Sequence, residues 1–129
     1  MDKELFGKAL GIEDPIFVEE IMFDSIGGEL HIKMNFHRGG KFACSECGTR
    51  DLPVYDTINK TWRHLNFFQY KCFIHLRTPR TECPKCGERL WIPPWGREQS
   101  GFTMTRYRTL GQIEHQISPH IIDLLQLTD

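Results

Sequence analysis

Two copies of one five-residue motif constrain this chain more than any other feature. The motif reads CSECG at 44–48 and CPKCG at 83–87, which gives the pattern Cys44-x2-Cys47-x35-Cys83-x2-Cys86. Two intervening residues allow one tight turn to place both thiolates on a single ion, about 2.3 Å from a zinc ion. The doubled motif therefore predicts one metal site that joins two segments far apart in the sequence.

A glycine follows the second cysteine of each motif, at Gly48 and Gly87. Such a position often needs a positive φ, so that backbone N–H groups can point at the sulfur atoms. Closing the 35-residue loop costs on the order of 3 kcal/mol, whereas structural zinc contributes roughly 10–16 kcal/mol in small modules. Four thiolates leave no open coordination position, so we expect a structural zinc and assign no catalytic residue. Iron accepts the same four-sulfur geometry and stays open as the alternative metal.

The composition is that of a globular protein of the cell interior. The chain has 129 residues, of which 40% are hydrophobic and 26% charged, so we expect one domain with a short appendage. No apolar run approaches the roughly 20 residues that cross a bilayer, and MDKELFGKAL lacks the features of an export signal. We therefore expect a cytoplasmic protein without a membrane partner, where paired cysteines more often hold metal than form disulfides.

Hydrophobic periodicity predicts the elements of residues 1–92. It indicates a short helix over 2–10 and a β-hairpin over 17–37 that turns at Gly27-Gly28. Residues 50–66 read as an irregular segment, and alternation resumes in a strand over 67–78. In that strand the even-numbered residues from Tyr70 to Leu76 are expected in the core. The odd-numbered ones, Lys71, Phe73, His75 and Arg77, are expected to face outward.

The C-terminal part has a different pattern. Residues 93–101 are predicted to be a linker, and residues 102–129 to form two helices of an incomplete helix-turn-helix. The expected fold class is therefore α+β. It consists of a small zinc-ribbon-like domain of antiparallel β-strands with a short N-terminal helix, followed by two C-terminal helices.

Basic residues are concentrated in the middle of the chain. The net charge of −1 conceals a balance of +4 over residues 41–99, which carry 10 Lys/Arg against 6 Asp/Glu, and no carboxylate occurs from Thr57 to Thr81. Cations in such a window can neutralise phosphates and release counterions. A solvated strand face that balances the acidic first forty residues is the alternative. We expect DNA contacts from Arg63, Lys71, Arg77 and Arg80, with Lys60, His64 and Gln69 secondary.

One further cysteine and two histidines also receive an expectation. Cys72 lies on the apolar face of its strand and is expected to be a buried small hydrophobe. His64 and His75 could replace a metal ligand, but with four cysteines already matched they are expected to hydrogen-bond or to contact phosphate. No role is assigned to His31.

Three stretches together resemble the N-terminal region of bacterial insertion-sequence transposases of the ISL-three type. They are WRHL at 62–65, PRTECPKCG at 79–87 and PPWGREQSGFT at 93–103, and the opening LFGKALGIEDPIFVEEIMFD is also similar. In that family a four-cysteine zinc finger precedes a helix-turn-helix and then a DDE-type catalytic domain. Carried over, the resemblance makes Cys44, Cys47, Cys83 and Cys86 the zinc ligands.

The resemblance implies a DNA-binding zinc-finger portion of a transposase that recognises transposon ends. The three metal-binding carboxylates of a DDE domain have no counterpart in this sequence, so we expect no DNA cleavage or joining by this chain alone. The implied setting is the bacterial cytoplasm, on the nucleoid when DNA is bound, and a homodimer through segments absent here is left open. Two alternatives remain: a rubredoxin-like electron carrier with iron held by the four cysteines, and a zinc-ribbon module that binds only protein.

Overall fold

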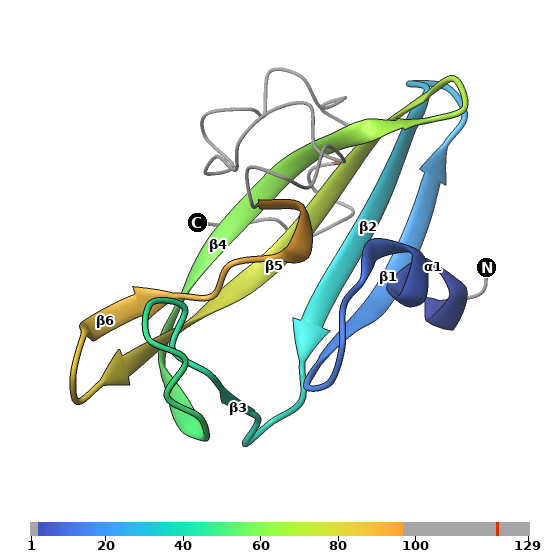
Figure 1. The fold of residues 1–129 in the computed structure, drawn as a ribbon. Helices are drawn as coiled ribbons and strands as arrows, with labels where there is room; N and C mark the ends of the chain where they lie inside the picture. The colour runs from blue at the N-terminus through green and yellow to red at the C-terminus, as the bar shows by residue number, and fades with distance from the viewer. Residues whose placement is uncertain (1–2, 97–120, 122–129) are drawn as a thin grey trace.

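The computed structural model describes residues 3–96 and residue 121, and the following account concerns these residues (Figure 1). They form one α-helix, six β-strands and a 3-10 turn. In chain order these are α1 (Lys3–Leu10), β1 (Ile16–Asp24), β2 (Glu29–Phe36), β3 (Lys41–Phe42), β4 (Leu52–Phe67), β5 (Tyr70–Cys83), β6 (Gly87–Leu90) and η1 (Pro94–Gly96). None of the described helices is long and apolar enough to cross a membrane.

The strands form a single mixed sheet that curls into a half-barrel. The order is β1-β2-β5-β4-β3, and β6 pairs with residues 80–83 of β5, beyond residues 71–76, which pair with β2. The β1–β2 and β4–β5 pairs are antiparallel hairpins, whereas β2 and β5 run parallel, with Leu30 opposite Cys72 and Met34 opposite Leu76. The parallel pair joins the two hairpins, and Figure 1 shows both of their tips at the same end of the sheet.

The core lies on one face of this curled sheet. Alternating positions of the four long strands supply apolar side chains, because successive residues of a strand point to opposite faces. Helix α1 and the segment after β6 pack against these side chains through Phe6, Leu10 and Trp95. The four long strands contribute the buried core residues Ile16, Val18, Leu30, Ile32, Met34, Trp62, Cys72, Ile74 and Leu76.

The expected α+β class is wrong. Strands hold 56% of the described residues and helices 12%, so the described part of the chain is a β structure with a single α-helix at its N-terminal end. The main error concerns residues 50–66, expected to be irregular, most of which belong to the 16-residue strand β4. The two helices expected within 102–129 fall on residues 97–120 and 122–129, outside the described residues.

Strand β4 lacks the alternation that identifies a half-buried strand. Its residues from Val54 to Lys60 are almost all of intermediate exposure, with no clean separation of inner and outer faces. The strand is rich in β-branched and aromatic residues, such as Thr57, Ile58 and Trp62, which are favoured on a pleated surface. The composition of residues 52–67 therefore indicates a strand, whereas their hydrophobic periodicity does not.

Strand β5 is buried on both faces at its centre, contrary to the outward orientation expected for its odd-numbered residues. Phe73 and His75 are only 0% and 2% exposed. The His31 ring on neighbouring β2 stacks against both of them, with centroid distances of 5.1 Å in each case. Lys71 and Arg77 are exposed. The odd-numbered residues at the centre of β5 are therefore packed inside the protein, against His31 of β2.

Candidate metal centre

The four cysteines of the doubled motif meet at one end of the sheet. Their sulfur atoms all lie within 4.8 Å of one another. The Sγ atoms of Cys47 and Cys83 are 3.6 Å apart. A tetrahedral ion with bonds of about 2.3 Å holds its sulfur ligands roughly 3.8 Å apart, whereas a disulfide needs about 2.05 Å. All five cysteines are free thiols, so the spacing fits a shared metal ion and not a disulfide.

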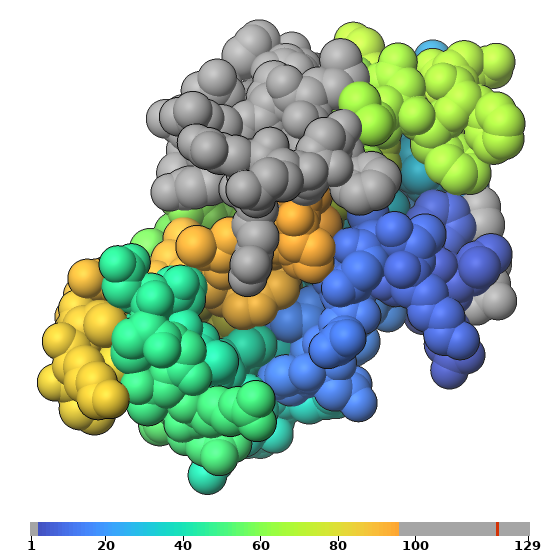
Figure 2. Space-filling view, in the orientation of Figure 1, coloured from blue at the N-terminus to red at the C-terminus, as the bar shows by residue number. Residues whose placement is uncertain are grey.

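Long-range strand pairing brings the two motifs together. Cys44 and Cys47 lie between β3 and β4, while Cys83 ends β5 and Cys86 lies in the turn to β6. The 35 residues between the motifs are mostly the β4–β5 hairpin, whose open end is closed by pairs such as Val54 with Thr81. The sheet thus aligns the ligands, and a metal ion would lock this open end. Figure 2 shows the two motifs packed together at one end and the hairpin tip at the other.

Both motif glycines have the backbone conformation that the sequence predicted. Gly48 and Gly87 each have a φ of 80°, in the left-handed region that side chains rarely adopt. In the first turn the Gly48 N–H donates to the Cys44 carbonyl at 3.0 Å, and the Glu46 N–H donates to the Cys44 sulfur at 3.4 Å. Such N–H groups stabilise a thiolate and orient it toward a metal.

The metal-free thiols have very different acidities. The Thr49 hydroxyl, 3.0 Å from the Cys47 sulfur, lowers the pKa of Cys47 to about 6. The pKa of Cys86 is raised to about 12, chiefly by its hydrogen bond to Cys47 and then by burial. Without a metal, the cluster would therefore hold thiolates and thiols together. A divalent cation is what allows all four to be thiolates, because its charge offsets their mutual repulsion.

The fifth cysteine is separate from this cluster. Cys72 lies in the apolar core, 3% exposed, and burial raises its pKa to about 12. It is a buried small hydrophobe, as its place on the even-numbered face of β5 predicted.

Two of the arginines expected to contact DNA are engaged within the protein. Arg80 forms ion pairs with Asp56 and Glu88. Arg63 is 9% exposed, donates to the Asn66 side chain at 2.7 Å and lies over the Phe73 ring. The charge of Arg80 is thus compensated, and Arg63 points into the structure.

Two other cations of this window are exposed to solvent. Lys71 lies near the start of β5, and the Arg77 guanidinium lies 4.6 Å from the centroid of the Phe36 ring. Arg77 also lines a cleft together with Arg38, a residue that sequence reasoning did not single out. The remaining lining residues are Asn35, Phe36, Gly39, Gly40, Pro53 and Val54, without a carboxylate.

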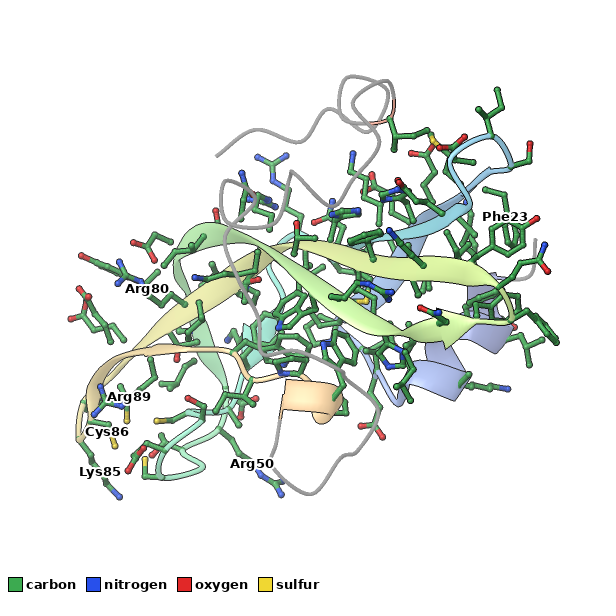
Figure 3. All side chains as sticks on the ribbon, turned by 90° about the horizontal axis from the view of Figure 1, so that it is seen from above. Phe23, Arg50, Arg80, Lys85, Cys86 and Arg89 are labelled. Atoms are coloured by element: carbon green, nitrogen blue, oxygen red, sulfur yellow. The ribbon has the colours of Figure 1, made fainter. Side chains whose placement is uncertain are left out.

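The three residues expected as secondary DNA contacts differ in their exposure to solvent. His64 is half-buried, and burial lowers its pKa. Lys60 is of intermediate exposure on β4, and Gln69 is exposed in the loop between β4 and β5. Other cations lie close to the four cysteines. Figure 3 shows Lys85 and Arg89 beside Cys86, and Arg50 lies on the loop between β3 and β4.

His75 does not pair with His64 but with His31. The His31 Nδ1 and His75 Nε2 atoms are 2.8 Å apart, His31 Nε2 is 2.8 Å from a Glu29 oxygen, and His75 Nδ1 is 3.0 Å from the Thr61 hydroxyl. Sequence reasoning gave His31 no role, because the parallel pairing of β2 with β5 leaves no local signal.

The comparisons with known proteins identify the segment that carries the metal centre. Residues 40–89 match the family model of the zinc-finger of transposase IS204/IS1001/IS1096/IS1165. No curated protein and no solved structure matches the chain. The matched segment contains both cysteine motifs and the hairpin between them. Residues 40–89 are therefore similar to the zinc-finger of the IS204/IS1001/IS1096/IS1165 transposases.

Proposed function

We propose that this chain is a zinc-loaded, non-catalytic DNA-binding module of a transposase, directed at the end sequences of its element. The observation that carries the proposal is the family match over residues 40–89, which contain all four clustered cysteines. A four-thiolate shell has no open coordination position, which supports a structural role for the ion. Zinc is the metal of such ribbons, and its sulfur spacing fits the 3.6 Å between Cys47 and Cys83.

The cleft lined by Arg38 and Arg77 is the best candidate for phosphate contact. It brings the exposed guanidinium groups of Arg38 and Arg77 to the same surface, and none of its lining residues is acidic. Guanidinium groups bind phosphate oxygens with two parallel hydrogen bonds. The Phe36 ring beneath Arg77 restricts that side chain, which reduces the entropy lost on binding.

The test is a salt titration of DNA binding by the full zinc-loaded chain, followed by fluorescence anisotropy. Wild-type affinity should fall steeply with salt, and Arg77→Ala should reduce the log–log slope by about 1. Arg80→Ala is the matched control, an arginine on the same strand whose charge is already compensated by Asp56 and Glu88. Undetectable or salt-independent binding would contradict the proposal. A preference for terminal inverted-repeat duplex over a scrambled duplex would establish end recognition.

The alternatives are separated by two inexpensive measurements. A red protein with charge-transfer absorbance after reconstitution would indicate iron and an electron carrier, whereas a colourless protein with one zinc ion supports the ribbon. A protein partner that is retained after nuclease treatment, in the absence of DNA binding, would indicate a module that binds only protein.

A further inference from the structure

The tip of the β4–β5 hairpin presents an aromatic side chain where physical chemistry favours glycine. Phe67 pairs with Tyr70, so Phe68 and Gln69 form a two-residue loop. Phe68 has a φ of 56°. A positive φ in such a loop favours glycine, asparagine or aspartate, and a bulky residue there is strained. Phenylalanine is therefore an unfavourable residue for the backbone conformation at position 68.

Burial does not compensate for this strain. Phe68 is 84% exposed. Its one ring neighbour within the described part of the chain is Phe67, at 4.9 Å. The strained backbone reduces stability and the exposed ring gains little from burial, so folding alone does not explain a phenylalanine at this position. Strain of this kind concentrates at functional sites.

The residues on either side of the two-residue loop make contacts that fix its position. The Phe67 ring lies 5.7 Å from Phe6 of α1 and 6.3 Å from Phe23 of β1. The Lys71 N–H donates to the Gly28 carbonyl at 2.9 Å, which ties this tip to the turn of the β1–β2 hairpin. Three elements thus position Phe68 before any partner arrives.

The surrounding charges favour a polyanion. No carboxylate occurs from Thr57 to Thr81, and the exposed Lys71 lies three residues from Phe68. The two carboxylates that flank the neighbouring turn, Asp24 and Glu29, are buried, and Glu29 is bound to His31. A nucleic-acid backbone can therefore approach the hairpin tip without facing a carboxylate of residues 57–81, which include the tip and the adjoining parts of both strands.

We propose that Phe68 is a wedge that enters between adjacent base pairs of bound DNA and unstacks them, an inference that rests on the proposed DNA-binding function. Proteins that bend DNA insert phenylalanine and other apolar side chains in this way. Arg77 lies seven positions after Tyr70 along the strand, about 23 Å at roughly 3.3 Å per residue. One duplex lying along the hairpin can thus contact both Arg77 and the tip.

The experiment uses the zinc-loaded full chain and duplexes carrying 2-aminopurine at successive positions, with anisotropy recorded in parallel. Wild type should raise 2-aminopurine fluorescence at one base step. Phe68→Gly should lose that signal and bind about tenfold more weakly, while its thermal midpoint stays equal or rises, because glycine accepts the positive φ. Tyr55→Ala is the control, since Tyr55 is another aromatic residue that is 54% exposed.

The outcomes separate this inference from the proposed function. If the wild-type chain shows no salt-dependent DNA binding, the proposed DNA-binding function itself is contradicted. Normal binding with no 2-aminopurine signal, or with equal signals from wild type and Phe68→Gly, would overturn the wedge alone. If Phe68→Gly instead abolished self-association in sedimentation and left the DNA signals intact, the tip would be a protein-binding surface and the wedge would again be overturned.

Discussion

The Nδ1 atom of His31 lies 2.8 Å from the Nε2 atom of His75, across the parallel pair β2–β5. One assignment of protons satisfies the whole chain of contacts with both rings neutral. His31 donates from Nε2 to Glu29, His75 donates from Nε2 to His31, and the Thr61 hydroxyl donates to Nδ1 of His75. A further proton on His31 Nδ1 would place two donors against each other.

The histidine pair should make stability depend on pH. Burial is the main cause that lowers the pKa of His31 and lowers that of His75 well below 6.5. As pH falls below about 6.5, the unfolded chain takes up protons that the folded chain does not, so the free energy of unfolding decreases. The decrease continues until pH reaches the folded-state pKa values. Urea unfolding of the zinc-loaded chain at pH 8, 7, 6 and 5 measures it.

His75→Gln is the informative comparison for that experiment. A glutamine can donate to His31 and accept from Thr61, but it cannot be protonated in this range. The variant should be less stable at pH 8 and lose less stability on acidification. Acid also displaces zinc from thiolates, but both proteins share that effect. Identical pH slopes would show that the pair does not contribute.

The metal centre was predictable from the sequence because its signal is local. Each pair of ligands lies within one turn, and the glycine after it reports the positive φ directly. The turn at Gly27-Gly28 is local in the same way, and β1 and β2 pair around it. Features of this kind depend on residues that are close in the chain, so the spacing and the residue types are enough to predict them.

The rest of the fold depends on contacts that no local pattern reports. The parallel pairing of β2 with β5 places His31 against Phe73 and His75, which are buried on the face expected to be outside. Asp56 lies outside the carboxylate-free window and still reaches Arg80, 24 residues away. The charge of a sequence window therefore overstated the charge available to a partner.

Loss of one cysteine ligand should abolish zinc binding. Cys83→Ser should lower zinc affinity by more than about 100-fold, since even partners of the ligands contribute 10–100-fold. Cys72→Ser is the control, because Cys72 lies outside the cluster and should retain one zinc ion per chain. Metal analysis after dialysis measures both. Full zinc occupancy in Cys83→Ser would contradict the four-ligand assignment.

Removal of zinc should loosen one end of the sheet more than its core. The main apolar core contains none of the four ligands, which lie in the loop before β4, at the last residue of β5 and in the turn before β6. Chelation should therefore speed amide exchange in residues 43–51 and 83–90, and change it much less in β2. Equal acceleration throughout the described strands would show that the metal supports the entire fold.

Replacing Gly87 should test the backbone requirement of the second motif. A Cβ atom at this position meets no atom within 4 Å, so a substitution has only the φ of 80° to overcome. Gly87→Ala should lower the free energy of unfolding by about 1 kcal/mol. Gly87→Asn should lower it less, because asparagine tolerates the left-handed region. Urea unfolding with zinc present measures both, and equal costs would point to a different cause.

Releasing Arg80 should strengthen DNA binding. Its guanidinium donates to both carboxylate oxygens of Asp56 and also lies 3.1 Å from Glu88. Asp56→Asn removes the main counter-charge, so Arg80 becomes available to phosphate and the log–log salt slope should steepen by about 1. Arg80→Ala in the Asp56→Asn background should return the slope to the wild-type value. If the double variant keeps the steeper slope, the added affinity comes from the lost carboxylate alone and Arg80 makes no contact.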